Sequence, residues 1–188
     1  MNCSLKEILI ENPVIAAVRD DVSLEKVFMS KASIVFVLYG NIMNIKDICS
    51  KLMQNNKTVF VHIDMIEGLK GDYAGIEFIK DKVNPSGIIT TKSSNIKYAK
   101  QLGLCTIQRI FIIDSYSLKT GIKNIQETEP NAVEVMPGVA SKIISKIQQK
   151  VKIPIIAGGL IDSKKDAMES LAAGAFAIST TCSELWSL

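Results

Sequence analysis

The chain has 188 residues, 47% of them hydrophobic and 22% charged, and a formal net charge of +3 at pH 7. This length suits one domain with a full core, and no apolar run is long enough to span a bilayer. The net charge is too small to indicate a dedicated nucleic-acid binder by itself. The four cysteines are scattered, without a CxxC pair, and there is one histidine, so we expect a reduced, cytoplasmic protein without a metal site or cofactor.

Short apolar runs, many of them β-branched, recur along the chain and predict eight strands. The runs are Val14–Val18, Ile34–Leu38, Val59–Ile63, Gly87–Thr90, Thr106–Ile113, Ala132–Val135, Ile153–Ala157 and Ala175–Ser179. Between them lie segments whose apolar residues have helical spacing, such as Ile96, Ala99 and Leu102. Gly103 and Gly174 stand where helix C-terminal caps are expected, each just before a strand.

Strands that alternate with helices over short connections indicate parallel pairing and a sheet covered by helices. Eight strands are the number that closes a (β/α)8 TIM-type barrel, so we expect a compact α/β barrel that forms one domain over residues 1–188. An open doubly wound sheet is the alternative, but such a sheet rarely needs eight strands in a chain of this length.

One predicted loop is longer than the others. It runs from Asp64 to Asp72, after the third strand, and the next helix is expected to start near Tyr73. Long loops on the functional face of a barrel often cover a ligand. A merely solvated loop explains the same composition equally well.

The rare polar residues fall on strands or at their C-terminal ends: Arg19, His62, Asp64, Arg109 and Glu134. Alternation along the sixth strand turns Val133 and Val135 toward the helices and points Glu134 into the barrel beside Arg109. Polar residues near the C-terminal mouth of a barrel usually belong to its site, whereas a structural ion pair that plugs the barrel is the alternative. Arg109 also has the planar fork that suits a phosphate group.

The last two strands end in residues that suit an anion. Gly158-Gly159 follows the seventh strand, and Ser179-Thr180 ends the eighth, so both pairs would meet at one edge. Thr181 and Glu184 have the spacing of a capping box, which would leave the next helix donors free for the anion. Lys92 would add positive charge over the mouth, and the neighbouring Ser93 and Ser94 resemble helix N-caps.

Catalytic groups are harder to identify. Asp64 and Glu134 could act as acid and base, with His62 as a proton shuttle, but no lysine lies within a predicted strand to form a Schiff base. We therefore assign no catalytic residue. For nucleic acid, the best feature is a stripe of Lys142, Lys146 and Lys150 on one helix face, although such stripes are most often simply solvated.

Several segments together resemble one known family. They are VFVHIDMIEGLKGDYAGIEFIK, GIITTKSSNIKYAKQLG, TIQRIFIIDS, AVEVMPGVA and IPIIAGGLI, and the similarity runs nearly end to end. This combination resembles the glycerol uptake operon antiterminator regulatory proteins of Gram-positive bacteria. The AGGL segment followed by IST is shared by many phosphate-binding barrels and would not decide alone. Asp162 departs from the pattern, because a basic residue is expected after Ile161.

The resemblance implies a barrel that senses glycerol 3-phosphate and acts on the untranslated leader of glycerol-operon messenger RNA, preventing premature termination. By position, Gly158, Gly159, Ser179 and Thr180 would hold the phosphate. The other strand-end residues, with Lys92, would line the polyol end. An enzyme acting on a small phosphorylated substrate and a scaffold that binds only a protein partner are the competing hypotheses. The sequence leaves the oligomeric state open, and a homo-oligomer is compatible with it.

Overall fold

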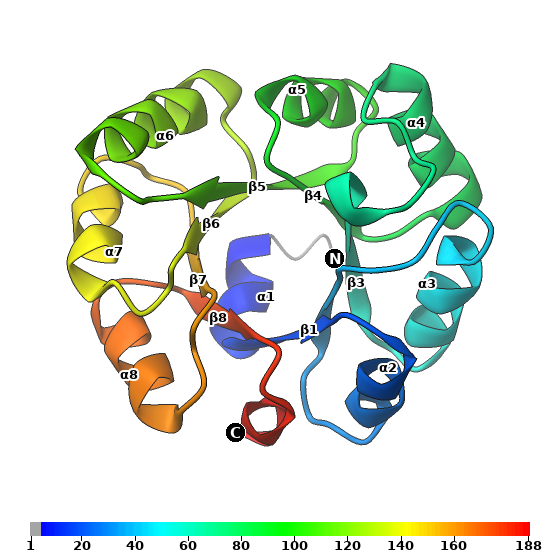
Figure 1. The fold of residues 1–188 in the computed structure, drawn as a ribbon, viewed down its shortest axis with the longest axis horizontal. Coiled ribbons are helices and arrows are strands. Elements are labelled where there is room, and N and C mark those ends of the chain that lie inside the picture. Colours follow the sequence, from blue (N-terminus) through cyan, green and yellow to red (C-terminus); the bar gives the residue numbers. More distant parts are fainter. Residues whose placement is uncertain (1–4) are drawn as a thin grey trace.

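The β-branched runs of the sequence form eight parallel strands that close into a barrel, as predicted (Figure 1). The computed structural model describes residues 5–188. The strands are β1 (Val14–Val18), β2 (Ile34–Val37), β3 (Thr58–His62), β4 (Gly87–Thr90), β5 (Cys105–Phe111), β6 (Ala132–Met136), β7 (Ile155–Gly158) and β8 (Ala177–Thr180). Each strand pairs with its neighbour in chain order, and β8 pairs with β1 to close the sheet. The predicted strand ends differ from these bounds by at most two residues.

Helices surround the barrel and alternate with the strands (Figure 1). They are α2 (Asp21–Phe28), α3 (Ile45–Gln54), α4 (Tyr73–Phe78), α5 (Ser93–Gln101), α6 (Ser115–Thr128), α7 (Ser141–Gln148) and α8 (Lys164–Ala172). A π-helical turn, η2 (Ile79–Val83), continues α4, and two short 3-10 helices, η1 (Ile63–Met65) and η3 (Ser183–Ser187), follow β3 and β8. No helix within residues 5–188 is long and apolar enough to cross a membrane.

The alternation along each strand divides the core into an inner and an outer layer. Val133 and Val135 of β6 pack outward with the helices, while Glu134 between them is fully buried inside the barrel. Inside, Phe36 and Phe60 meet edge to face with ring centroids 5.9 Å apart. The prediction that Glu134 points inward is therefore confirmed.

An N-terminal helix, α1 (Leu5–Glu11), was not predicted from the sequence. It lies across the far end of the barrel in Figure 1, opposite the C-terminal ends of the strands. Its Leu9 is fully buried and belongs to the same cluster as Ile15, Phe36 and Phe60. The helix thereby closes the N-terminal end of the barrel and leaves the C-terminal end as the mouth.

Local signals at helix ends were predicted with mixed success. Gly103 (φ +74°) and Gly174 (φ +108°) follow α5 and α8 in the left-handed conformation, which confirms their role in ending helices. The capping box expected from Thr181 to Glu184 is wrong, because η3 starts at Ser183 after Cys182 and receives no side-chain cap. Ser93 and Ser94 are not N-caps either, since α5 begins at Ser93 and Lys92 precedes it.

Candidate functional site

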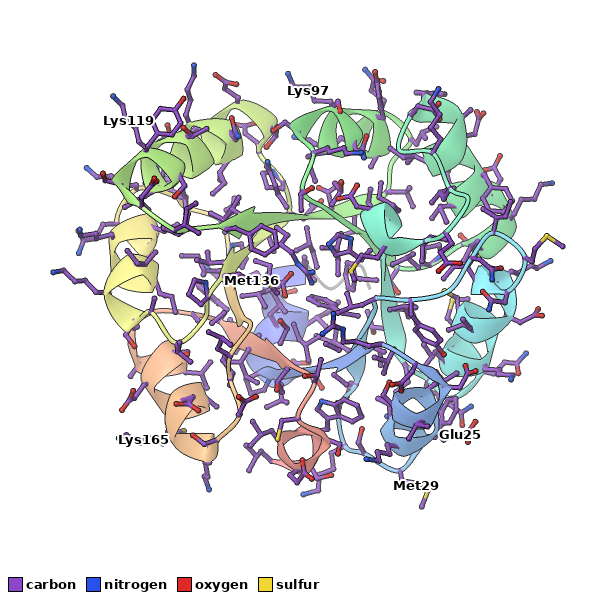
Figure 2. All side chains as sticks on the ribbon, in the orientation of Figure 1. Glu25, Met29, Lys97, Lys119, Met136 and Lys165 are labelled. Carbon is purple, nitrogen blue, oxygen red and sulfur yellow. The ribbon has the colours of Figure 1, made fainter. Side chains whose placement is uncertain are left out.

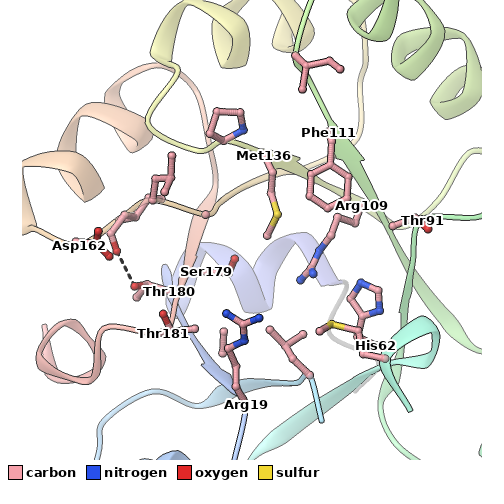
Figure 3. Close-up of a pocket in the computed structure, with 18 residues that line it drawn as sticks. Arg19, His62, Thr91, Arg109, Phe111, Met136, Asp162, Ser179, Thr180 and Thr181 are labelled. Atoms are coloured by element: carbon pink, nitrogen blue, oxygen red, sulfur yellow. Dashed lines mark hydrogen bonds between the residues drawn. The ribbon is translucent and has the colours of Figure 1, made fainter. Parts of the chain in front are cut away.

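A cavity of about 680 Å³ opens at the mouth of the barrel (Figure 3). Its polar lining comes from the ends of several strands and from the loops that follow them: Arg19, His62, Thr91, Arg109, Asp162, Ser179, Thr180 and Thr181. Because the carboxyl ends of parallel strands meet at one edge of a barrel, residues that are distant in the sequence come together here. Of the polar residues predicted at strand ends, Arg19, His62 and Arg109 converge at this mouth.

Both arginines of the chain reach this cavity, one from β1 and one from β5. The Nε of Arg109 donates to Oε2 of Glu134 at 2.6 Å, and its terminal nitrogens point into the cavity (Figure 3). Arg19 follows β1 at the rim, and its guanidinium has no hydrogen bond or ion pair among residues 5–188. Two guanidinium groups with free donors therefore face the same space, an arrangement suited to an anion with several oxygens.

Glu134 does not line the cavity, but inside the barrel it is held from two sides by residues that do. Its Oε1 accepts a hydrogen bond of 2.5 Å from Ser179 Oγ, while Oε2 accepts from Arg109. A Cβ added at Gly158 would lie 2.5 Å from Glu134 Oε1 and 2.7 Å from Ser179 Oγ. Gly158 is therefore needed for close approach to this pair, and both carboxylate oxygens of Glu134 are occupied.

His62, at the end of β3, is 3% exposed and lines the cavity beside Arg109 (Figure 3). Its Nδ1 is buried and has no hydrogen-bond partner among the described residues. Burial, followed by the positive charge of Arg109, lowers the pKa of His62 to about 4, although the carboxylate of Asp64 acts in the opposite direction. The imidazole is consequently neutral at pH 7 and retains hydrogen-bonding capacity.

The loops after β7 and β8 form one wall of the cavity. Gly159 and Thr181 line it, and Thr180 Oγ1 donates to the carbonyl of Ile161 at 2.7 Å, which ties the two loops together (Figure 3). The hydroxyl of Ser179 is also occupied, because it donates a hydrogen bond to Glu134 Oε1. A phosphate at this wall would therefore depend on backbone groups and Arg19 more than on the two hydroxyls.

Asp162, the acidic residue found where the resemblance implied a basic one, lies on this same wall. Its carboxylate has no hydrogen bond or ion pair within residues 5–188 and is exposed to solvent. A free carboxylate beside a proposed phosphate site opposes the binding of a dianion.

Four predicted site residues do not line the cavity: Glu134 and Gly158 lie behind Arg109 and Ser179, and Asp64 and Lys92 lie elsewhere. Asp64 accepts hydrogen bonds from the Thr91 amide at 2.7 Å and from the hydroxyls of Thr90 and Thr91, so it fastens η1 to the loop after β4. Lys92 does not line the cavity; its Nζ lies 3.6 Å from the place where a Gly71 Cβ would be. Of the long loop after β3, Met65 reaches the cavity.

The lysine stripe is only partly helical. Lys142 and Lys146 are exposed on α7, but the helix ends at Gln148, so Lys150 lies beyond it. Gln126 Nε2 donates to the carbonyl of Lys150 at 3.3 Å and connects this end to α6. The stripe is thus interrupted at its C-terminal end.

The apolar part of the cavity lining was largely missed by sequence reasoning. It comprises Ala17, Leu38, Met65, Phe111, Ile113, Met136, Pro137, Leu160 and Ile161. Three of these, Phe111 (55%), Ile113 (87%) and Leu160 (68%), are strongly exposed. Phe111 shares the inward face of β5 with Arg109, and that spacing was the one signal that pointed to it.

Comparisons with known proteins agree with this architecture. The family model of the glycerol-3-phosphate responsive antiterminator matches residues 14–186. A glycerol uptake operon antiterminator regulatory protein from Listeria monocytogenes superposes with a TM-score of 0.89 at 32% identity, covering 99% of this chain and 96% of that one. For a glycerol uptake operon antiterminator-related protein from Thermotoga maritima, the TM-score is 0.83, the identity 36% and the coverage 93% and 98%.

A curated relative, the uncharacterized protein YgcP of Escherichia coli K12, is 38% identical over 184 residues, which are 98% of this chain and 96% of that protein. Its length and the two structures indicate that the similarity extends through the whole barrel, including the strand ends that form the cavity. The chain therefore belongs to the glycerol-3-phosphate responsive antiterminator family.

Proposed function

We propose that this chain is a regulator that binds glycerol 3-phosphate in the mouth cavity and, when loaded, binds the leader of glycerol-operon messenger RNA and prevents premature termination. The observation that carries the proposal is the convergence of the chain's two arginines, with free guanidinium donors, on one cavity. Membership of the antiterminator family supports the same effector and the same regulatory class.

The phosphate of the ligand would lie between Arg19 and the wall formed by the loops after β7 and β8. Gly159 and Thr181 supply backbone there, and Gly158 permits the approach of Glu134 beneath it. The hydroxyls of the glycerol part would meet Arg109 and His62 at the inner end, where the unpaired imidazole nitrogen has lone-pair or donor capacity to offer. Lys92 and Asp64 are left out of this arrangement because neither lines the cavity.

Binding without turnover is favoured by how the acidic groups are used. Glu134 is paired with Arg109 and Ser179, and Asp64 is held by Thr90 and Thr91, so neither carboxylate is free to move a proton on a ligand. No lysine occurs in the described lining of the cavity to form a Schiff base. The free guanidinium nitrogens of Arg19 and Arg109 are donors that recognise an anion, whereas the one free carboxylate among the described lining residues, Asp162, is exposed on the wall.

The test compares ligands first and RNA second. Glycerol 3-phosphate should raise the melting temperature, whereas glycerol and inorganic phosphate, each supplying half of the contacts, should raise it much less. Arg19→Gln should remove most of the shift. Leader RNA should then bind more tightly with glycerol 3-phosphate than without it, since an effector must change affinity in order to regulate.

Equal RNA binding with and without the ligand would refute the coupling. Turnover of a phosphorylated triose or sugar that is lost in Asp64→Asn or Glu134→Gln would instead favour an enzyme. A chain whose melting temperature responds to no phosphorylated polyol would favour a scaffold for a protein partner.

A further inference from the structure

The mouth cavity is larger and more apolar than a glycerol phosphate requires. Its volume of about 680 Å³ is in the middle of the range found for drug-sized ligands, about 300–1,000 Å³. The proposed effector is a small polyol phosphate without an apolar group, so it would fill only the polar end. The apolar lining that the polyol phosphate would leave uncovered suits an occupant that is partly apolar.

The cavity has an inner polar part and an outer apolar part. At the inner end, His62 and Arg109 are 3% and 6% exposed and hold their polar atoms toward the ligand space. At the outer end, Phe111, Ile113 and Leu160 are 55%, 87% and 68% exposed. Large apolar side chains gathered around an opening, as these are, usually mark a binding surface.

Two of these outer residues are held in positions that a purely structural role does not explain. Ile113 directly precedes the Asp114 N-cap of α6, where an apolar residue commonly packs on the first turn, yet it stays 87% exposed. Leu160 adopts φ +60°, a left-handed conformation that leucine rarely takes, and is also exposed. Ile113 and Leu160 therefore present apolar surface to a ligand that enters the cavity.

The unpaired cation that borders this cavity is Arg19, whose guanidinium has no hydrogen bond or ion pair among residues 5–188. Lys119 on α6 projects away from the barrel (Figure 2) and does not line the cavity. Apolar side chains that include an aromatic ring, beside a free guanidinium, suit an unpaired nucleobase whose neighbouring phosphate lies at the rim.

We propose that the outer half of the cavity receives one unpaired base of the RNA, stacked on Phe111 above the ligand. This inference rests on the RNA binding proposed above. RNA-binding proteins commonly splay out single-stranded bases and stack them on aromatic side chains. Because Phe111 and Arg109 share the inward face of β5, the base and the ligand would be neighbours in one cavity. Each would then bury surface that the other leaves open, which couples the two binding events.

The test uses the full chain loaded with glycerol 3-phosphate and a leader RNA carrying 2-aminopurine at its unpaired positions. Stacking on Phe111 should quench the fluorescence of one position when the protein binds. Phe111→Ala should abolish that quenching and weaken RNA binding about fivefold or more, the effect of losing one stacked base. Phe111→Trp should retain both, because it keeps an aromatic face.

Matched controls separate the site from general surface effects. Met43, 84% exposed in the loop before α3 and not part of the cavity lining, supplies the apolar control, Met43→Ala. Lys119→Gln on α6 and Lys97→Gln on α5, whose side chains both project away from the barrel (Figure 2), are the charge controls and should leave the quenching unchanged. Melting curves of each variant show whether the fold is retained.

Each outcome decides a different point. RNA binding by the wild type that is unchanged in Phe111→Ala and produces no local quenching would overturn this inference and leave the proposed function intact. Failure of the wild type to bind RNA at all would overturn the proposed function. If sedimentation shows that Phe111→Ala instead dissociates a dimer, the outer surface is an interface between two copies, and the base site is refuted.

Discussion

Arg109 and Glu134 lie opposite each other on β5 and β6 and form an ion pair of 2.6 Å inside the barrel, where they are 6% and 0% exposed. Their adjacency follows from the strand register, which pairs these two positions directly. The pair orients the arginine by its Nε and leaves the terminal nitrogens for the cavity. The same ion pair therefore stabilises the barrel and sets the position of the Arg109 guanidinium in the cavity.

Glu134→Gln should destabilise the protein by about 3–5 kcal/mol, because it leaves the buried guanidinium of Arg109 without its counter-charge. Ser179→Ala should cost less, about 1–3 kcal/mol, since it removes a single hydrogen bond to that carboxylate. Urea unfolding monitored by circular dichroism measures both. The control is Glu127→Gln in the exposed Lys123–Glu127 pair of 3.7 Å, for which we expect less than about 1 kcal/mol. Equal effects at Glu134 and Glu127 would contradict the structural role of the buried pair.

Gly158→Ala should lower the free energy of unfolding by about 1–3 kcal/mol through overpacking against Glu134 and Ser179. It should also weaken binding of glycerol 3-phosphate, because the displaced carboxylate carries Arg109 with it. Calorimetric titration and thermal melts measure the two effects. Gly103→Ala is the comparison, since an added methyl there meets nothing within 4 Å and only its backbone conformation is strained. Unaltered ligand affinity in a destabilised Gly158→Ala would separate the glycine from the site.

His62 should titrate near pH 4, and as the chain's single histidine it gives one imidazole signal by NMR. Its pKa is lower in the folded state than in the unfolded one, so between about pH 6.5 and 4 the unfolded chain binds more protons. Stability is fully retained above pH 6.5 and falls as the pH decreases through this window, by about 3 kcal/mol at most. His62→Asn should remove that part of the pH dependence. Glycerol 3-phosphate should raise the pKa of His62, because the negative charge of the ligand offsets the positive charge of Arg109.

An imidazole that titrates at its ordinary pKa near 6.5 would show that His62 is solvated in solution, contrary to its 3% exposure. A pKa that does not respond to the ligand would place the phosphorylated polyol away from the inner end of the cavity. These two measurements can be read separately from one titration series.

Asp162→Asn should tighten binding of glycerol 3-phosphate by about two- to fivefold, since it removes an exposed like charge from the cavity wall. The affinity for glycerol should not change, because glycerol carries no charge for Asp162 to repel. Glu169→Gln, on the exposed surface of α8, is the charge-matched control. Isothermal titration at low and high salt checks the cause, as the difference should shrink with added salt. Weaker phosphate binding in Asp162→Asn would mean that this carboxylate orients a ligand group instead.

The regular part of the fold was predictable because its signals are local. Alternation along β6 was enough to turn Glu134 inward, and the register then brought Arg109 beside it. The N-terminal helix was missed because α1 has seven residues, and its burial depends on the open end of a barrel that forms from the rest of the chain. The capping box predicted at Thr181 is absent because a neighbouring residue makes the contact instead. The Cys182 amide donates to Thr180 Oγ1, so the backbone turns there without using the Thr181 side chain.

The composition of the site was less predictable than its position. Strand-end placement found Arg19, His62 and Arg109, all of which line the cavity. It could not tell that Asp64 would turn toward Thr90 and Thr91, because that choice depends on the path of the loop after β4. Strand-end placement could not identify Leu160 either. The exposure of this side chain depends on a left-handed backbone conformation at Leu160, which a leucine in the sequence does not predict.

Closure of the N-terminal end of the barrel by α1 has a kinetic consequence. Leu9 is buried among the inner side chains, so within the described residues 5–188 the opening for a ligand lies between the loops at the mouth. RNA lying across that opening would have to depart before the small molecule could. Under the proposed function, release of glycerol 3-phosphate from the ternary complex should be slower than from the protein alone, and a bound leader would prolong the lifetime of the ligand complex that recruited it.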